Sequence, residues 1–217
     1  MARVYSEFPF SGRHGNIVYF TRNGKTFMKE YKEPKDPKTP NQLKSRARLR
    51  ATGKFLKQFK NIIRKGYQAP VNYTSSYMEA QKYVLDNCLK PVGTPDDGKE
   101  YQFEIDIPSL KLSRGRITPP EINAIERNEN ELSLEWNKSL GPQPNRHYDS
   151  LNIVAYATGQ NVIWLSDIGT RQDGAGKCHL PGTIQEPVHL WAFFSNEQKT
   201  MKPNQENISN SIYLGIL

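Results

Sequence analysis

The hydrophobic and polar positions of this 217-residue chain change their spacing part-way along the sequence. Residues 16 to 31, NIVYFTRNGKTFMKEY, contain two β-prone runs on either side of the pair Asn23-Gly24. Asn-Gly is the preferred sequence of a two-residue hairpin turn, because both positions take a positive φ. The segment therefore predicts a β-hairpin, with Arg22 and Lys25 beside its turn.

A 3.6-residue period follows from Asn41 to about Lys65 and predicts a helix. The sequence Thr39-Pro40 with Gln42 is typical of a helix start, and Gly66 is a typical helix end. One side of this helix is apolar, with Leu49, Phe55, Leu56, Phe59, Ile62 and Ile63. The opposite side carries six cations, Arg46, Arg50, Lys54, Lys57, Lys60 and Arg64. A second helix, from about Ser75 to Leu89, is expected to pack on the first.

Beyond Pro91 the pattern changes to short β-prone runs at intervals of roughly 8 to 12 residues, the spacing of an antiparallel sandwich or barrel. The predicted strands are 101 to 107, 110 to 112, 122 to 125, 131 to 136, 151 to 157, 162 to 166, 188 to 195 and 208 to 216. The segment DIGTRQDGAGK, which has Arg171 where a phosphate-binding loop requires glycine, is predicted to be a Gly-rich turn.

The predicted fold class is α+β with two modules. Residues 1–92 form a basic module of a β-hairpin and two helices, and residues 93–217 form a β-sandwich module. The run PPEINAIERNENELSLEWN resembles the opening of a fibronectin type III domain, and VHLWAFFSNEQ with NISNSIYLGIL resembles its last two strands. This resemblance implies a fibronectin III/Ig-like core at about 117–217. It implies no particular function, since this sandwich has many unrelated roles.

Charge is concentrated at the start of the chain. Residues 1 to 66 hold 17 of the 30 Lys and Arg but 4 of the 22 acids, and no acid occurs between Lys44 and Lys65. Lys44 and Arg48 project on the apolar side of the predicted helix. Such a positive field attracts polyanions. The alternative is a solvated face, but such faces usually intersperse acids that pair with the cations. Arg22 and Lys25 extend the candidate polyanion-binding set, although lysines on a strand also serve as edge protection.

Aromatic residues suggest a second kind of surface. In the predicted strand 188 to 195, Trp191 shares a face with His189 and Phe193, while the opposite face is also apolar, so both faces require cover. We therefore identify Trp164 and Trp191 as candidate interface aromatics. An interface within the chain or between subunits is the favoured interpretation, and a carbohydrate platform is the alternative. Tyrosines at 67, 73, 77 and 83 are expected to serve the core rather than stack on bases.

Catalytic and metal-binding patterns are missing from the sequence. The four histidines have no paired-ligand spacing, and Cys88 and Cys178 form no CxxC motif, so we predict no metal, no cofactor and no catalytic residue. We expect a non-enzymatic protein. The two cysteines permit a reducing compartment, and no apolar run is long enough for a signal or a membrane span. The expected location is cytoplasmic or virion-associated, without a membrane.

Three segments, GRHGNIVYFTRNGKTFMKEY, PKDPKTPNQLKSRARLRATGKFLKQF and SNSIYLGIL, resemble a bacterial family of about 200 residues known as a domain of unknown function. The stretch PKTPNQLKSRARL is also similar to a P-x-T-P-x-Q-x-x-x-R stretch in small proteins of phage-like gene clusters. The larger family transfers no catalytic residue. The shorter similarity implies a role in virion or mobile-element assembly.

These observations lead to three functional hypotheses. The first is a binding or assembly protein whose basic module contacts nucleic acid, without base specificity, through phosphate charge. The second is a structural oligomer, such as a phage or mobile-element particle component, whose basic helix docks on an acidic protein surface. The third is a carbohydrate-binding sandwich that uses Trp164 and Trp191.

Overall fold

The computed structural model describes residues 2–4, 11–33, 35–67, 75–93, 101–139, 141, 146–158, 162–182, 187–196 and 207–217. The chain divides into two compact units, Met1–Pro40 and Asn41–Leu217, which we call unit 1 and unit 2. Each unit is described by itself.

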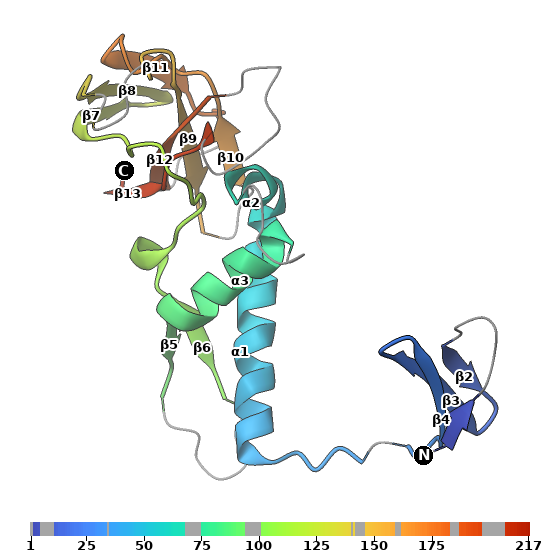
Figure 1. The fold of residues 1–217 in the computed structure, drawn as a ribbon. Coiled ribbons are helices and arrows are strands. Elements are labelled where there is room, and N and C mark those ends of the chain that lie inside the picture. The colour runs from blue at the N-terminus through green and yellow to red at the C-terminus, as the bar shows by residue number, and fades with distance from the viewer. Residues whose placement is uncertain are drawn as a thin grey trace. The chain divides into compact units, whose positions relative to one another are not determined.

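Unit 1 contains one antiparallel sheet of four strands in the order β1-β4-β3-β2 (Figure 1). The strands are Ala2–Val4 (β1), Gly12–His14 (β2), Ile17–Arg22 (β3) and Lys25–Glu30 (β4). Asn23 and Gly24 connect β3 to β4 with φ values of 52° and 71°, as a type I′ turn requires. The predicted hairpin is confirmed. The outer strands β1 and β2 were not predicted.

The helices of unit 2 follow the predicted segments. They are Pro40–Leu56 (α1), which includes the last residue of unit 1, Lys60–Gly66 (α2) and Ser76–Asn87 (α3), and a 3-10 helix, Lys57–Phe59 (η1), joins α1 to α2. The Ser75 hydroxyl accepts a hydrogen bond from the Met78 amide at 3.2 Å and caps α3. Leu56, Phe59, Ile62 and Ile63 are buried as predicted. The prediction for Leu49 was wrong, because this side chain is 49% exposed.

The remainder of unit 2 is a β-sandwich. One sheet has the order β11-β8-β7, and the other has the order β10-β9-β12-β13. The strands of the sandwich are Ile122–Asn128 (β7), Glu131–Trp136 (β8), Ser150–Tyr156 (β9), Val162–Leu165 (β10), Ala175–His179 (β11), His189–Ser195 (β12) and Ile212–Ile216 (β13). All pairings within the two sheets are antiparallel. This division into three and four strands confirms the fibronectin type III-like sandwich.

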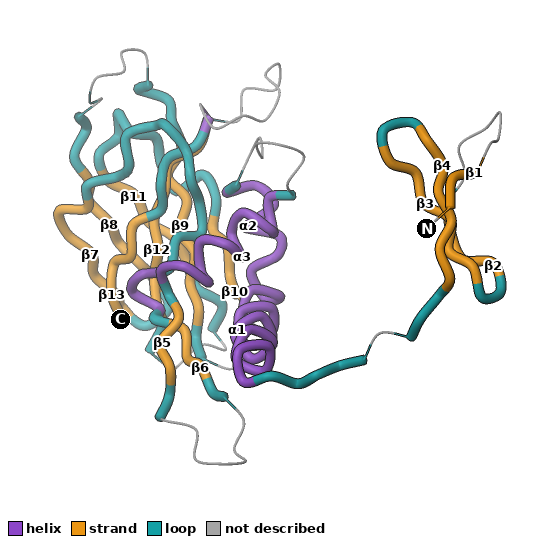
Figure 2. The backbone as a smooth tube through the Cα atoms, turned by 60° about the horizontal axis from the view of Figure 1, so that its bottom comes forward, coloured by secondary structure: helices purple, strands orange, loops and turns teal. Residues whose placement is uncertain are grey.

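A two-stranded sheet lies beside α1, as Figures 1 and 2 both show. It pairs Leu89–Pro91 (β5) with Phe103–Ile105 (β6), and a short 3-10 helix, Ile107–Ser109 (η3), follows. The predicted strand at 110 to 112 is wrong, although Leu110 and Leu112 are buried. Its backbone bonds to side chains instead: the Trp191 indole donates to the Leu110 carbonyl at 3.1 Å, and the Ser211 hydroxyl accepts from the Leu112 amide at 2.8 Å.

Part of the Gly-rich segment forms a strand. Residues 171–173 make the predicted turn, but Ala175–His179 pairs with β8. This strand was missed because its residues, AGKCH, have low β-propensity.

Unit 2 has three layers. Helices α1 to α3 cover one face of the four-stranded sheet, and the three-stranded sheet covers the other face (Figures 1 and 2). Phe59 contacts both Tyr156 and Trp191, with ring centroids 5.3 Å and 6.1 Å apart. The predicted division at residue 92 is therefore corrected, because the helices share a hydrophobic core with the sandwich and belong to its unit.

Candidate nucleic-acid interface

The six cations predicted on one face of the helix are all exposed. They are Arg46, Arg50, Lys54, Lys57, Lys60 and Arg64, and we call them the basic stripe. At 1.5 Å per residue the basic stripe is about 27 Å long. It is contributed by α1, η1 and α2, whose opposite side is anchored in the core by Leu56, Phe59 and Ile63. Burial of the apolar side thus holds the cations on the solvent side.

The stripe has an unbalanced charge. No acid occurs between Asn41 and Gly66. Within the described part of the chain, Lys54, Lys57, Lys60 and Arg64 form no ion pair. These ammonium and guanidinium groups repel one another, and an anionic partner would relieve that repulsion.

Two other cations of this segment have structural roles. The Arg48 guanidinium donates to the Leu85 carbonyl at 2.6 Å and ties α1 to α3. The Lys65 ammonium lies 4.7 Å from the centre of the Trp164 ring. Lys44, which was predicted on the apolar side, is exposed, as are all residues from Pro40 to Arg46. The first turns of α1 therefore extend beyond the part of the helix that the sheet covers.

Arg22 and Lys25 lie opposite each other across the β3-β4 turn and are exposed. Their register places them on the face that carries Phe20, Phe27 and Lys29. The Phe20 and Phe27 rings stack with centroids 5.7 Å apart. These two cations belong to unit 1, whereas the basic stripe belongs to unit 2.

The two candidate interface tryptophans differ in environment. Trp191 has no exposed surface and packs under the helices, so its ring is not open to a sugar. Trp164 is half-buried, and its indole donates to the Asn152 amide oxygen at 3.3 Å. It lines a polar pocket of about 360 Å³ whose rim includes Lys65 and Tyr148. The carbohydrate hypothesis thus retains only Trp164.

The tyrosines near the helices serve the fold. Tyr67, Tyr77 and Tyr83 donate hydrogen bonds to the carbonyls of Lys111, Gly53 and Ser109 at 2.9, 3.3 and 3.2 Å. Tyr73 lies outside the described residues. This agrees with the prediction that tyrosines here are structural.

Sequence reasoning missed a groove next to the basic stripe. A volume of about 810 Å³ lies between α1 and β6, and Arg50 and Lys54 line it. Its other walls come from Val92, which follows β5, from β6 and its neighbouring residues, and from the end of β9. The only sequence signal for it is the pair of small residues Ala47 and Ala51, which are one turn apart on α1 and also line the groove.

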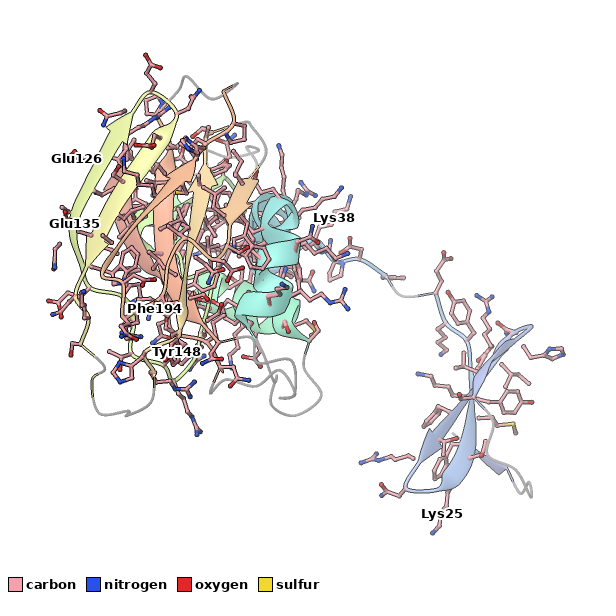
Figure 3. All side chains as sticks on the ribbon, turned by 90° about the horizontal axis from the view of Figure 1, so that it is seen from above. Lys25, Lys38, Glu126, Glu135, Tyr148 and Phe194 are labelled. Atoms are coloured by element: carbon pink, nitrogen blue, oxygen red, sulfur yellow. The ribbon has the colours of Figure 1, made fainter. Side chains whose placement is uncertain are left out.

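Acidic side chains occupy the opposite side of unit 2. Figure 3 shows Glu126 and Glu135 on the three-stranded sheet, on the side away from α1 and α2. Both are exposed. The neighbouring Glu131 is paired with Lys177 at 2.7 Å, and this ion pair lowers the pKa of Glu131. Unit 2 therefore presents a basic side and an acidic side.

Groups that could bind a metal do not converge within the described residues. No cluster of three His, Cys, Asp or Glu that would hold a metal occurs there. Cys88 and Cys178 are free thiols, and burial raises the pKa of each to about 11, which makes them poor nucleophiles. Arg171 is buried in the sandwich rather than exposed in a phosphate loop.

Comparison with known protein families identifies the family of this chain. Residues 9–215 match DUF6266, a family of unknown function. The chain belongs to this family. The match includes the hairpin, the helices and the sandwich, which confirms the nearly end-to-end resemblance seen in the sequence. No curated protein matches the chain. Among the described residues, none of the helices has the length and apolar character that crossing a membrane requires.

Proposed function

We propose that this protein binds nucleic acid through the basic stripe, by phosphate charge and without base specificity. One observation carries the proposal: six exposed cations stand on one face of a helix segment that contains no acid. DNA phosphates form a linear array of negative charge, so several of them would lie within reach of a stripe about 27 Å long. The described residues offer no base-reading element, and phosphate contacts alone carry no sequence information.

The test is fluorescence anisotropy of labelled double-stranded DNA, single-stranded DNA and RNA with the full chain. If about five phosphates are neutralised on duplex DNA, the logarithm of the binding constant should fall with log salt with a slope near −4.5. Duplexes of different sequence should bind equally. Absence of binding at low salt would refute the proposal.

A matched pair of variants locates the surface. Lys57→Glu with Arg64→Glu reverses two stripe cations, and Lys82→Glu with Lys138→Glu makes the same change in net charge at exposed lysines elsewhere in unit 2. The stripe variant should bind duplex DNA at least about tenfold more weakly and lose about 2 from the salt slope. The control should bind nearly as the natural chain does. Equal losses in both variants would mean that net charge, not the stripe, drives binding.

The acidic side of unit 2 favours a second candidate function, a structural assembly in which the basic stripe docks on an acidic protein surface such as Glu126 and Glu135 of a neighbouring copy. Such a head-to-tail contact would build rings or filaments. Light scattering would detect it as salt-sensitive self-association. Lys57→Glu/Arg64→Glu and Glu126→Lys/Glu135→Lys should each fail to assemble alone, and a mixture of the two should assemble again. A monomer at all concentrations would exclude this candidate.

A further inference from the structure

The groove between α1 and β6 has an apolar floor. Phe55 of α1 and Tyr156 at the end of β9 lie in it, with ring centroids 5.9 Å apart, and Ile105 of β6 joins them. On the α1 wall, Ala47 and Ala51 have short side chains that leave room for a ligand. The floor belongs to the core cluster of unit 2, so the groove is a feature of a packed element.

The second wall of the groove is an open strand edge. The Val92 amide donates to the Gln102 carbonyl at 3.0 Å, and the Asp106 amide donates to the Cys88 carbonyl at 2.7 Å. In an antiparallel pair these contacts alternate, so residues 102, 104 and 106 face β5. Phe103 and Ile105 therefore direct their amides and carbonyls away from β5. Within the described residues, no hydrogen bond satisfies these outward groups.

The two outer edges of the β5-β6 sheet differ in the backbone amides that they present. On β5, the outward positions are Leu89 and Pro91, and proline has no amide hydrogen to donate. A proline on an edge strand is a common protection against unwanted pairing. On β6, both outward residues keep their donors. Pro91 thus disfavours the addition of a strand at the β5 edge, which lies away from the groove. The β6 edge, which lines the groove, can still accept a strand.

Charge distinguishes which peptide would suit this edge. Arg50 and Lys54 line the α1 side, and Glu104 is the one carboxylate among the described lining residues, so these residues carry a net positive charge. Arg50 and Lys54 also belong to the basic stripe, which extends the positive field beyond the groove. An acidic segment would therefore be attracted, and a basic one repelled.

We propose that this groove binds an extended acidic segment of a partner protein, which adds a strand to the edge of β6. The segment would bond to the backbone of Phe103 and Ile105, place alternate apolar side chains on Phe55 and Tyr156, and direct carboxylates to Arg50 and Lys54. The apolar floor and the backbone edge suit a peptide better than a phosphate chain. This inference goes beyond nucleic-acid binding and shares only Arg50 and Lys54 with it.

The experiment uses the full chain and a fluorescein-labelled decapeptide of alternating valine and glutamate. Anisotropy should show saturable binding. A decapeptide of alternating valine and lysine should bind at least about tenfold more weakly, because two charge interactions become repulsive. The valine-glutamate peptide should lose binding when N-methyl groups are placed on every second residue, on those residues whose amides face β6. The edge of the peptide that faces β6 then has no hydrogen-bond donors. No saturable binding up to about 1 mM overturns the proposal, since this limit corresponds to only about 4 kcal/mol of binding energy.

Variants separate the groove from the stripe. Ala51→Trp fills the groove and should abolish peptide binding while DNA binding is retained. Lys57→Glu/Arg64→Glu, whose residues lie outside the groove lining, should weaken DNA binding at least about tenfold but peptide binding by no more than about threefold, because exposed charges beyond the groove are partly screened by salt. Ala47→Trp, one turn earlier, is the second groove-filling variant, and melting curves establish that each variant folds. Peptide binding that survives both tryptophan variants overturns the proposal. DNA binding lost in both would instead assign the groove to nucleic acid.

Discussion

The sheet of unit 1 and the four-stranded sheet of unit 2 are both antiparallel, yet they bury their residues to different degrees. In unit 1, Thr26 is the only described side chain that is buried, and the central Phe20 and Phe27 are half-exposed. In unit 2, five consecutive residues of β12, Leu190 to Phe194, are buried. The difference comes from cover: helices and a second sheet enclose β12, whereas no second layer covers the described part of unit 1.

This comparison indicates which unit contributes more to the unfolding free energy of the protein. A sheet gains free energy mainly from the apolar area it removes from water, which requires a second layer. Unit 2 has two such interfaces and unit 1 has none among its described residues. The candidate binding surfaces of unit 2, the basic stripe and the groove, therefore lie on the unit that buries more apolar surface.

Replacing one phenylalanine in each unit should give the largest effect and should test whether the two units differ in stability. Phe59→Ala removes a fully buried ring between the helices and the sheet and should cost about 3–5 kcal/mol of unfolding free energy. Phe20→Ala, in unit 1, should leave the unfolding of unit 2 unchanged within about 0.5 kcal/mol. Tryptophan fluorescence in urea measures this directly, since Trp136, Trp164 and Trp191 are all in unit 2. A large shift in the Phe20→Ala curve would show that the units unfold together.

Arg171 provides the next largest test, because it is a buried charge in unit 2. Its guanidinium donates to the carbonyls of Ser139 and Thr118 at 3.0 and 2.7 Å and lies 3.7 Å from the Asp149 carboxylate. Arg171→Met would leave that carboxylate buried without this partner and should cost about 3–5 kcal/mol. Arg171→Met with Asp149→Asn should cost less, because no charge is then left unpaired.

The pH dependence of Arg171→Met has a definite sign. Burial already raises the pKa of Asp149, and loss of the guanidinium should raise it further. The folded state then holds the proton more tightly than the unfolded state, so stability should fall as pH rises through the interval between the two pKa values. Urea titrations at several pH values check this. A variant that becomes more stable as pH rises would contradict the assignment.

Two helical glycines of unit 2 test how tightly the helix segment packs on its neighbours. A methyl group at Gly66 would collide with the Leu112 carbonyl, so Gly66→Ala should destabilise unit 2 by about 1–3 kcal/mol. A methyl group at Gly53 would meet only the Gln81 amide nitrogen at 4.0 Å, so Gly53→Ala should stabilise by about 0.5–1 kcal/mol. Melting temperatures of the two variants should move in opposite directions. Movement in the same direction would contradict this packing.

The smallest effect concerns the thiols, which report on unit 2 alone because Cys88 and Cys178 are its only cysteines and unit 1 has none. Burial raises the pKa of both from 9.0 to about 11. At pH 8 a thiol reagent should therefore react about 100-fold more slowly with the folded protein than with the unfolded one.

The sign of the accompanying stability change follows from the same shift. Folded thiols keep their protons to higher pH than unfolded thiols, so their contribution is fully present below pH 9 and is lost as pH rises from 9 towards 11. Cys88→Ala/Cys178→Ala should flatten this part of the stability curve. Rapid labelling of the folded chain at pH 8 would mean that unit 2 opens easily.

Local signals in the sequence predicted the elements that short-range physics controls. Asn23-Gly24 predicted the hairpin because only a few residues adopt positive φ there. The helix expected from about Ser75 does begin at that point, where the Ser75 hydroxyl caps a free amide. The arc of the six stripe cations followed from helix geometry alone. The strand Ala175–His179 was missed, because it is held by pairing with β8 about 40 residues away rather than by its own propensity.

By itself, the sequence determined the hairpin, the helices, most sandwich strands and the sorting of charge, because each depends on neighbours within a few turns or strand pairs. Only the tertiary structure decided that the helices belong with the sandwich, since Phe59 meets Tyr156 and Trp191 far along the chain. The groove is likewise a tertiary feature. Its walls come from α1, β6 and β9, and no local pattern encodes the distance between elements that only the shared core brings together.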